Sequence, residues 1–197
     1  MPVLLVSAEL PARVAERLRG LRGTRWVGID GFGATGKTTL AAAVARALPG
    51  AVVVHVDDLS RPGVAGWERE RFVTQVLEPL RAGRPGRYQR WDWSSDAGAE
   101  WHDVAVGVPV VLEGVSSTDV RTGVPWDVRV WVEADREVRL ARALERDGPA
   151  MLARWLDDWM PSEERYAAAQ RPRDRADLVV RTGSEPCPAP GVSPGPG

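Results

Sequence analysis

The residues best suited to chemistry are a glycine-rich stretch that ends in a lysine and a hydroxyl side chain. It fits the pattern G-x-x-x-x-G-K-[ST], in which backbone N–H groups cradle phosphates, the lysine reaches the outer phosphates and the hydroxyl ligates Mg²⁺. An apolar strand precedes it and an Ala-rich helix follows, so a helix N-terminus also faces the phosphates. A glycine-rich turn without a ligand is the structural alternative, but the full pattern in this context favours nucleotide binding. The residues expected to bind nucleotide are Gly31, Phe32, Gly33, Ala34, Thr35, Gly36, Lys37, Thr38 and Thr39.

Lys37 is the only lysine among 26 Lys and Arg residues. The surplus of Arg, together with Ala, Gly, Val and Pro, is typical of a composition bias. That bias does not explain why a lysine stands inside the phosphate motif. A compact ammonium group that contacts the β- and γ-phosphates does explain it, so we expect Lys37 to act in catalysis.

Two acidic residues follow predicted buried strands. Asp57 comes after the apolar run 52–56, and Glu113 comes after the run 110–112. Because ligands of parallel α/β sheets bind at the carboxyl ends of the strands, both carboxylates are expected beside the phosphates. There, one carboxylate can hold Mg²⁺ and another can take the proton of an acceptor hydroxyl. We assign Asp57 as the base and Glu113, with Thr38, as metal ligands; the alternatives are that Asp58 is the base or that these acids only cap turns.

Three arginines lie at helical spacing after the predicted strand 128–132. Arg139, Arg142 and Arg146 are separated by three and four residues, which places them along one helix face. Arginine donors beside a transferring phosphoryl group stabilise the charge on its oxygens. We therefore predict catalytic roles for Arg142 and Arg146, and a solvated face paired with Asp135 and Glu145 is the alternative.

The chain contains nine tryptophans. Most, such as Trp26 and Trp131 within strand runs, are expected to pack in the core. Trp91 and Trp93 instead lie in the polar, turn-rich segment 88–103, which is predicted to form a hairpin or a lid-like excursion. They are expected to wall the acceptor site, with ordinary packing as the alternative.

The elements that must position these residues alternate between strands and helices. Continuous apolar runs predict parallel strands at residues 25–30, 51–56, 108–112, 128–132 and 176–181, and helices are predicted at 7–21, 36–48, 67–81 and from 136 onward. This order predicts an α/β domain with helices on both faces of the sheet. We expect residues 25–183 to form that domain, residues 1–24 a helical extension packed on it, and residues 184–197 a disordered Pro-rich tail.

Length and composition exclude several classes of protein. A chain of 197 residues fits one domain, and 44% hydrophobic with 27% charged residues is typical of a soluble protein. The net charge of −1 argues against broad attraction to nucleic acid or anionic lipid, and no apolar run approaches the roughly 20 residues of a membrane span. Cys187 is the only cysteine, the apolar run 3–6 lacks a basic leader, and His55 and His102 have no metal-ligand set. We expect a cytoplasmic protein without nucleic-acid or membrane partners.

The ordered set of motifs resembles the uridine kinase-like branch of P-loop kinases over residues 26–181. After the phosphate loop, the matching segments are Asp57-Asp58-Leu59-Ser60-Arg61, similar to the family's Asp-x-Phe-Tyr-Arg; Trp91-Asp92-Trp93, similar to Tyr-Asp-Phe; Glu113-Gly114, similar to Glu-Gly; Arg139-Leu140-Ala141-Arg142, similar to the lid arginines; and Ala176-Asp177-Leu178-Val179-Val180, similar to the last strand.

The resemblance implies a three-layer P-loop kinase fold with a five-stranded parallel sheet, helices on both faces and a helical lid. It implies ATP or GTP as donor, Mg²⁺, Asp57 as the base and a small-molecule hydroxyl as acceptor. It also implies that the acceptor contacts Asp58, Arg61, Asp96 and Arg139 besides the two tryptophans.

The acceptor side departs from the family pattern at three places. No Asp-His-Pro segment lies between Arg61 and Phe72, Asp96 stands where the family has a base-recognising histidine, and Ser60 replaces a tyrosine. A nucleoside, a nucleoside monophosphate and a sugar or other metabolite therefore all stay open as acceptors. An ATPase switch without a phosphorylated product is a further alternative, and the number of subunits is open.

Overall fold

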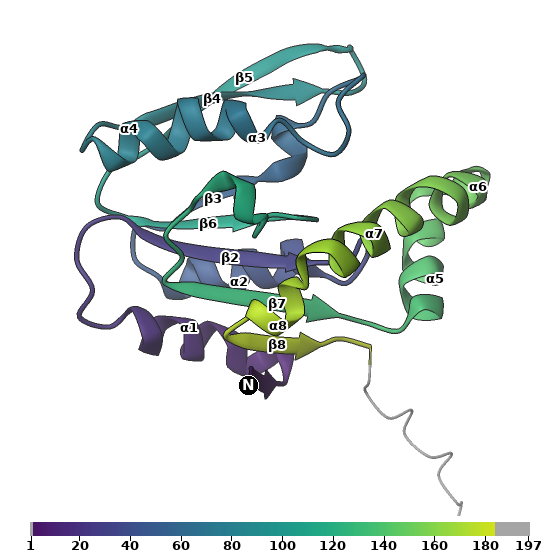
Figure 1. Ribbon diagram of the computed structural model, residues 1–197, viewed down its shortest axis with the longest axis horizontal. Coiled ribbons are helices and arrows are strands. Elements are labelled where there is room, and N and C mark those ends of the chain that lie inside the picture. Colours follow the sequence, from purple (N-terminus) through teal and green to yellow (C-terminus); the bar gives the residue numbers. More distant parts are fainter. Residues whose placement is uncertain (1, 184–197) are drawn as a thin grey trace, which may run out of the picture.

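Six parallel strands form the central sheet, in the order β1-β8-β7-β2-β6-β3 (Figure 1). The computed structural model describes residues 2–183, so the predicted tail lies outside the described residues. The strands are β1 (Val3–Leu5), β2 (Arg25–Gly31), β3 (Val52–His55), β6 (Pro109–Glu113), β7 (Val128–Glu133) and β8 (Leu178–Arg181). The parallel α/β architecture is confirmed.

The predicted count of five strands is wrong, because β1 adds a sixth strand at the edge of the sheet. β1 pairs in parallel with β8, with Val3 opposite Leu178. The partner strand lies more than 170 residues away in the sequence, so no local sequence pattern predicts the pairing. The helix predicted from residue 7 to 21 is also shorter: α1 covers Leu10–Leu18, a single turn of 3₁₀ helix at Ser7–Glu9 precedes it, and Leu21 is exposed.

Helices cover both faces of the sheet. On one face, Val27 and Ile29 of β2 belong to a core cluster with α1 and with α2 (Lys37–Ala47). On the other face, Trp26 packs in a cluster with the helical stretch that begins at α3 (Arg69–Phe72) and ends at α4 (Glu78–Arg81), joined by a wider π turn over Val73–Leu77. Because successive side chains of a strand point to opposite faces, β2 is buried on both sides.

The segment between α4 and β6 forms the predicted hairpin. β4 (Gly86–Asp92) and β5 (Ala97–Val104) pair antiparallel as a separate two-stranded sheet. Tyr88 and Val104 are buried in the same cluster as Trp26, which anchors the base of the hairpin on the domain.

The C-terminal helices are α5 (Arg136–Asp147), α6 (Leu152–Arg154), α7 (Met160–Gln170) and α8 (Pro172–Arg175). Of these helices, α5 and α6 lie beyond the carboxyl ends of β2 and β7, and α7 runs back toward α8, which lies beside β7 (Figure 1). No helix within residues 2–183 combines the length and the apolar character that a bilayer crossing requires.

Candidate active site

The predicted phosphate loop connects β2 to α2 along a curled path that two glycines permit. Gly31 has φ +151°, and a Cβ there would overlap the carbonyl oxygen of Val132 on the neighbouring strand. Gly36 has φ +87° immediately before α2 begins. Side chains other than glycine are strained in this region, so both positions require glycine. The loop thereby sets the N-terminus of an 11-residue helix at the carboxyl edge of the sheet.

The Lys37 side chain folds back over the loop. It is 7% exposed, and Nζ donates a hydrogen bond to the carbonyl oxygen of Phe32 at 2.7 Å. Burial lowers the pKa of the Lys37 ammonium, while the carboxylates of Glu113, Glu163 and Asp30 oppose that shift. A buried ammonium among carboxylates is a group poised to contact an anionic ligand.

Glu113, Thr38 and His55 meet at the end of β6. Thr38 Oγ1 donates to Glu113 Oε1 at 3.2 Å, so the two predicted metal ligands lie side by side. His55, at the end of β3, lies opposite Glu113 in the sheet, and its Nδ1 is 2.5 Å from the same Oε1. The hydrogen bond to Glu113 raises the pKa of His55. Sequence analysis gave His55 no role; its position at a strand end, two residues before Asp57, was the available signal.

The two neighbouring acids Asp57 and Asp58 have different surroundings. Asp58 accepts a hydrogen bond from the Tyr88 hydroxyl of the hairpin at 3.1 Å. Asp57 has no hydrogen-bond or ion-pair partner for its carboxylate among the described residues. The Asp57 residue is exposed to solvent, yet desolvation by the surrounding protein, followed by the negative charge of Glu113, raises its pKa. A carboxylate with a raised pKa and free oxygens is suited to accept a proton.

The three arginines of α5 have different partners. Arg139 is buried and reaches the loop backbone, where its Nε donates to the carbonyl oxygen of Gly33 at 3.1 Å. Arg142 donates to the Thr182 hydroxyl at 3.1 Å, and Thr182 in turn donates to the carbonyl oxygen of Thr35 at 2.8 Å. The structure therefore brings both arginines to the phosphate loop: Arg139, which was predicted to contact the acceptor, is held there instead, and the catalytic role of Arg142 stays a prediction.

Arg146 stands one turn further along α5 and faces solvent. Its guanidinium pairs with Asp147 at 2.7 Å and lies over the ring of Trp155. The hydrogen bond to Asp147 raises the pKa of Arg146, and the negative charge of Asp57 contributes in the same direction. Arg146 thus lies within electrostatic reach of the predicted base.

A buried carboxylate beneath the phosphate loop escaped sequence analysis. Asp30, the residue before Gly31, is 1% exposed and accepts hydrogen bonds from the backbone N–H groups of Gly31, Ser116 and Thr118. The Tyr166 hydroxyl on α7 donates to Asp30 Oδ2 at 2.6 Å. Burial raises the pKa of Asp30 against the effect of these donors. An acid inside an apolar strand run was the signal that could have found it.

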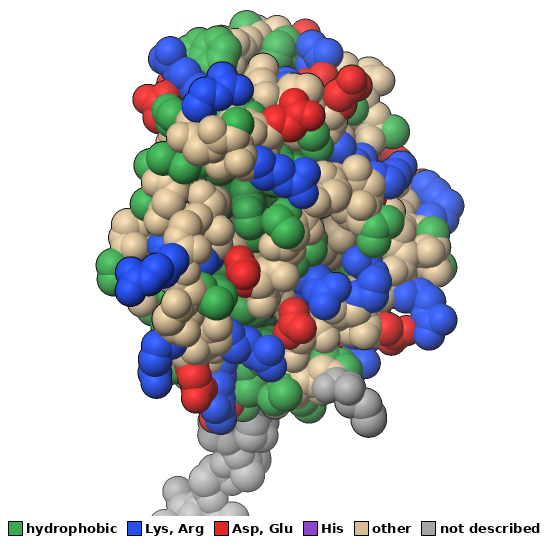
Figure 2. All heavy atoms as spheres, turned by 60° about the vertical axis from the view of Figure 1, so that its left-hand side comes forward, with side chains coloured by type: hydrophobic (Ala, Val, Ile, Leu, Met, Phe, Trp, Pro, Cys, Tyr) green, Lys and Arg blue, Asp and Glu red, His purple; other side chains and the backbone are tan. Residues whose placement is uncertain are grey.

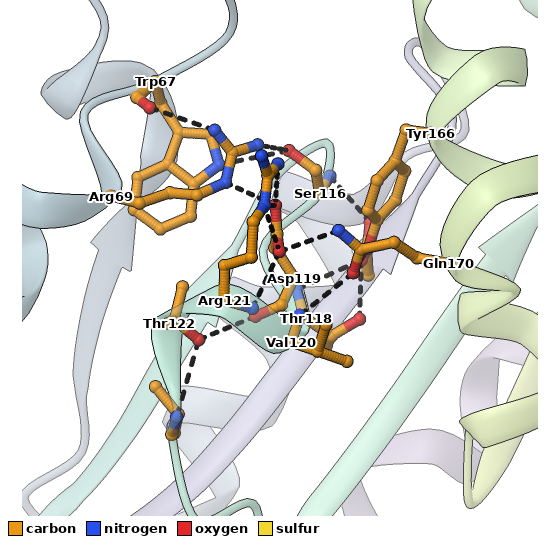
Figure 3. Close-up of polar contacts among 12 residues, drawn as sticks. Trp67, Arg69, Ser116, Thr118, Asp119, Val120, Arg121, Thr122, Tyr166 and Gln170 are labelled. Atoms are coloured by element: carbon orange, nitrogen blue, oxygen red, sulfur yellow. Dashed lines mark hydrogen bonds and ion pairs between the residues drawn. The ribbon is translucent and has the colours of Figure 1, made fainter.

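Beyond Ser116 and Thr118, whose backbone N–H groups bind Asp30, the loop after β6 carries a second polar cluster around Asp119 (Figure 3). Asp119 is fully buried and pairs with Arg69 of α3 at 2.5 Å, and Gln170 of α7 donates to it at 2.8 Å. Arg69 also donates to the Ser116 hydroxyl at 3.1 Å. The loop is therefore fixed from both sides, and Glu113 at its start is held in place.

The acceptor-side residues fall into two groups. Arg61, Trp91 and Asp96 line one cavity of about 490 Å³, together with residues 62–64. Trp93, which was predicted to share this wall, is 57% exposed and is not among the lining residues.

Charged side chains do not gather into one basic surface on the face shown in Figure 2, where Lys and Arg side chains are interspersed with Asp and Glu. The absence of a nucleic-acid partner stays a prediction.

Two solved structures share this fold across nearly the whole chain. A possible uridine kinase from Bacillus stearothermophilus has a TM-score of 0.63 and 19% identity, with 88% of this chain and 98% of that chain covered. A candidate fructose transport system kinase from Silicibacter sp. TM1040 has a TM-score of 0.62 and 22% identity, with 89% and 98% covered. No family model and no curated protein matches the sequence. The chain has the P-loop kinase fold.

Proposed function

We propose that this protein is a cytoplasmic kinase that transfers the γ-phosphate of ATP, or of GTP, to a hydroxyl group of a small molecule. The observation that carries the proposal is the convergence of three features at one edge of the sheet. These are the lysine of the phosphate loop, the Thr38–Glu113 pair and the unpartnered carboxylate of Asp57. A nucleotide switch needs the first two features but has no use for a general base.

The residues present fit a magnesium nucleotide. The Thr38 hydroxyl and the Glu113 carboxylate offer adjacent oxygen ligands 3.2 Å apart, and oxygen is the ligand that Mg²⁺ prefers. His55 fixes the orientation of the Glu113 carboxylate through its ring nitrogen. When bound, Mg²⁺ would neutralise charge on the phosphate oxygens.

The transfer step assigns one task to each side chain. Asp57 takes the proton of the acceptor hydroxyl while the acceptor oxygen forms a bond to the γ-phosphorus, and the bond to the β–γ bridging oxygen breaks. Lys37 leaves the Phe32 carbonyl for the β- and γ-phosphates. We assign to Arg146 the task of offsetting charge on the transferred group, since the negative charge of Asp57 acts on its guanidinium.

The experiment that tests the proposal uses ATP labelled at the γ-phosphate and a panel of nucleosides, nucleoside monophosphates, sugars and amino alcohols. We expect label on one acceptor class, and we expect Asp57→Asn to lower the rate of that transfer by about 10²–10⁴-fold. Asp103→Asn, which removes an exposed acid from the hairpin, is the matched control. Hydrolysis of ATP without a labelled acceptor, unchanged in Asp57→Asn, would instead identify an ATPase and defeat the proposal.

A further inference from the structure

Helix α7 contacts the catalytic edge through three polar side chains on one face. Glu163, Tyr166 and Gln170 are separated by three and four residues, a spacing that places them on the same side of a helix. The first binds the phosphate loop, the second binds the end of the strand before it, and the third binds the loop that follows β6. Their partners are, in that order, Gly33 at 3.0 Å, Asp30 at 2.6 Å and Asp119 at 2.8 Å. One helix face therefore contacts all three segments.

The Asp30 carboxylate joins two of these segments to each other. Its Oδ1 accepts the N–H of Gly31, where the phosphate loop begins, at 2.7 Å. The same oxygen accepts the N–H of Ser116, three residues after Glu113, at 2.9 Å. Tyr166 binds this carboxylate from outside both loops. The hydroxyl on α7 thus helps to set how the loop after Glu113 lies relative to the phosphate loop.

Gln170 holds the far part of the loop after β6 (Figure 3). Its amide nitrogen donates to Asp119 Oδ1 at 2.8 Å, and its amide oxygen accepts the N–H of Val120 at 3.0 Å. Both ends of the amide are therefore used in one orientation. Together with the contact through Asp30, these bonds attach α7 to the loop at two separate places.

The loop after Glu113 has a backbone that needs such support. Gly114 has φ +135°, and a Cβ there would overlap Cγ2 of Val56, the residue before Asp57. Ser116 has φ +60°, a left-handed conformation that is uncommon outside glycine. Backbone of this kind persists where the surrounding structure holds it, and it clusters at functional sites. The position of Glu113 at the start of the loop therefore depends on partners that are distant in the sequence.

We propose that Tyr166 and Gln170 are positioning residues for the magnesium site. This inference rests on the proposed function and adds two residues to its machinery. Within residues 2–183, neither side chain is hydrogen-bonded to Thr38 or Glu113, so both act through the loop that they hold. They keep the Glu113 carboxylate beside the Thr38 hydroxyl. Because the same helix binds the phosphate loop through Glu163, the position of α7 favours the binding of nucleotide and of Mg²⁺ together.

The test measures binding of a non-hydrolysable ATP analogue by calorimetry, once with Mg²⁺ and once with EDTA. The ratio of the two Kd values is the gain in affinity that Mg²⁺ supplies. We expect Tyr166→Phe and Gln170→Ala each to lower this ratio by roughly three- to tenfold, with Kd in EDTA unchanged. Arg165→Ala, which changes an exposed residue of the same helix, should retain the wild-type ratio.

A wild-type ratio in both variants would overturn the inference and leave the kinase assignment intact. Equal weakening with Mg²⁺ and with EDTA would also overturn it, since that is the result of a purely structural role. Where Tyr166→Phe is too unstable to titrate, Gln170→Ala decides alone, because it truncates a half-buried side chain near the end of the helix. Binding needs no acceptor, so a failure to phosphorylate any acceptor defeats the proposed function without changing these ratios.

Discussion

The carboxylate of Glu163 accepts a hydrogen bond from the backbone N–H of Gly33 at 3.0 Å, which ties helix α7 to the phosphate loop. The same oxygen pairs with Arg139 of α5 at 2.7 Å, and Arg139 donates to the carbonyl oxygen of Gly33. One buried ion pair therefore holds both polar groups of a single loop residue. The loop keeps its shape because two helices that follow much later in the chain support it.

Removal of Glu163 should destabilise the protein strongly. In Glu163→Ala, Arg139 stays buried with no acid partner, and breaking such pairs costs about 3–5 kcal/mol. The double variant Glu163→Leu with Arg139→Met removes both charges and should recover part of the loss. Urea unfolding measures the free energies. A double variant that is less stable than Glu163→Ala would contradict this account.

Replacement of Lys37 should separate activity from stability. Burial already disfavours the charged form of Lys37, so Lys37→Met is expected to keep or raise the melting temperature. Transfer should fall by roughly 100-fold or more, because the charge beside the outer phosphates is lost. Arg46→Met, which removes an exposed cation from the same helix, should retain full transfer. A Lys37→Met protein that is folded and fully active would disprove the role assigned to the loop.

The features that could be predicted from the sequence are those that short local patterns encode. The phosphate loop and the acids at strand ends are signalled by residues within a few positions of one another, and the structure places them together. The spacing of Arg139 and Arg142 predicts a shared helix face but not its direction, which is set by Glu163 and Thr182, 24 and 40 residues away in the chain. The pairing of edge strand β1 with β8 and the hydrogen bonds to Asp30 from Ser116, Thr118 and Tyr166 likewise join residues that lie far apart in the sequence.

The pH profile of kcat/KM should have an acidic limb that reports the protonation of Asp57. Its folded-state pKa is raised by desolvation and by Glu113, and a base must be deprotonated, so kcat/KM should fall as the pH drops through a pKa above the usual 3.8. Asp57→Asn should lower kcat by about 10²–10⁴-fold. Asp58→Asn, which loses only the bond from Tyr88, should keep the limb and most of kcat. If Asp58→Asn has the larger effect on kcat, the assignment of the base is reversed.

The hydroxyl of Tyr166 should contribute to stability through Asp30. Tyr166→Phe removes one donor to a fully buried carboxylate, and hydrogen bonds to charged groups are worth about 1.5–3 kcal/mol. Asp30→Asn should cost more, because an amide N–H₂ group would face the N–H groups that the carboxylate now accepts. Denaturant unfolding measures the free energy of unfolding of both variants. The control is Arg165→Ala, which changes an exposed residue of α7 that has no contact with Asp30. If Tyr166→Phe lowers the free energy of unfolding no more than the control does, the hydrogen bond to Asp30 does not help to hold α7.

Glu113 should set the magnesium requirement. Its carboxylate lies beside the Thr38 hydroxyl, so Glu113→Gln removes a negative ligand without changing the shape of the site. We expect the Mg²⁺ concentration for half-maximal activity to rise by roughly tenfold. His55→Gln, which weakens only the orientation of Glu113, should raise it less. Glu133→Gln, at the end of β7 where the carboxylate pairs with Arg173, is the matched control and should leave the requirement unchanged. Titration of activity with Mg²⁺ at saturating ATP decides the matter: an unchanged midpoint in Glu113→Gln would show that the metal is held elsewhere, because the substitution removes the acid next to Thr38 and little else.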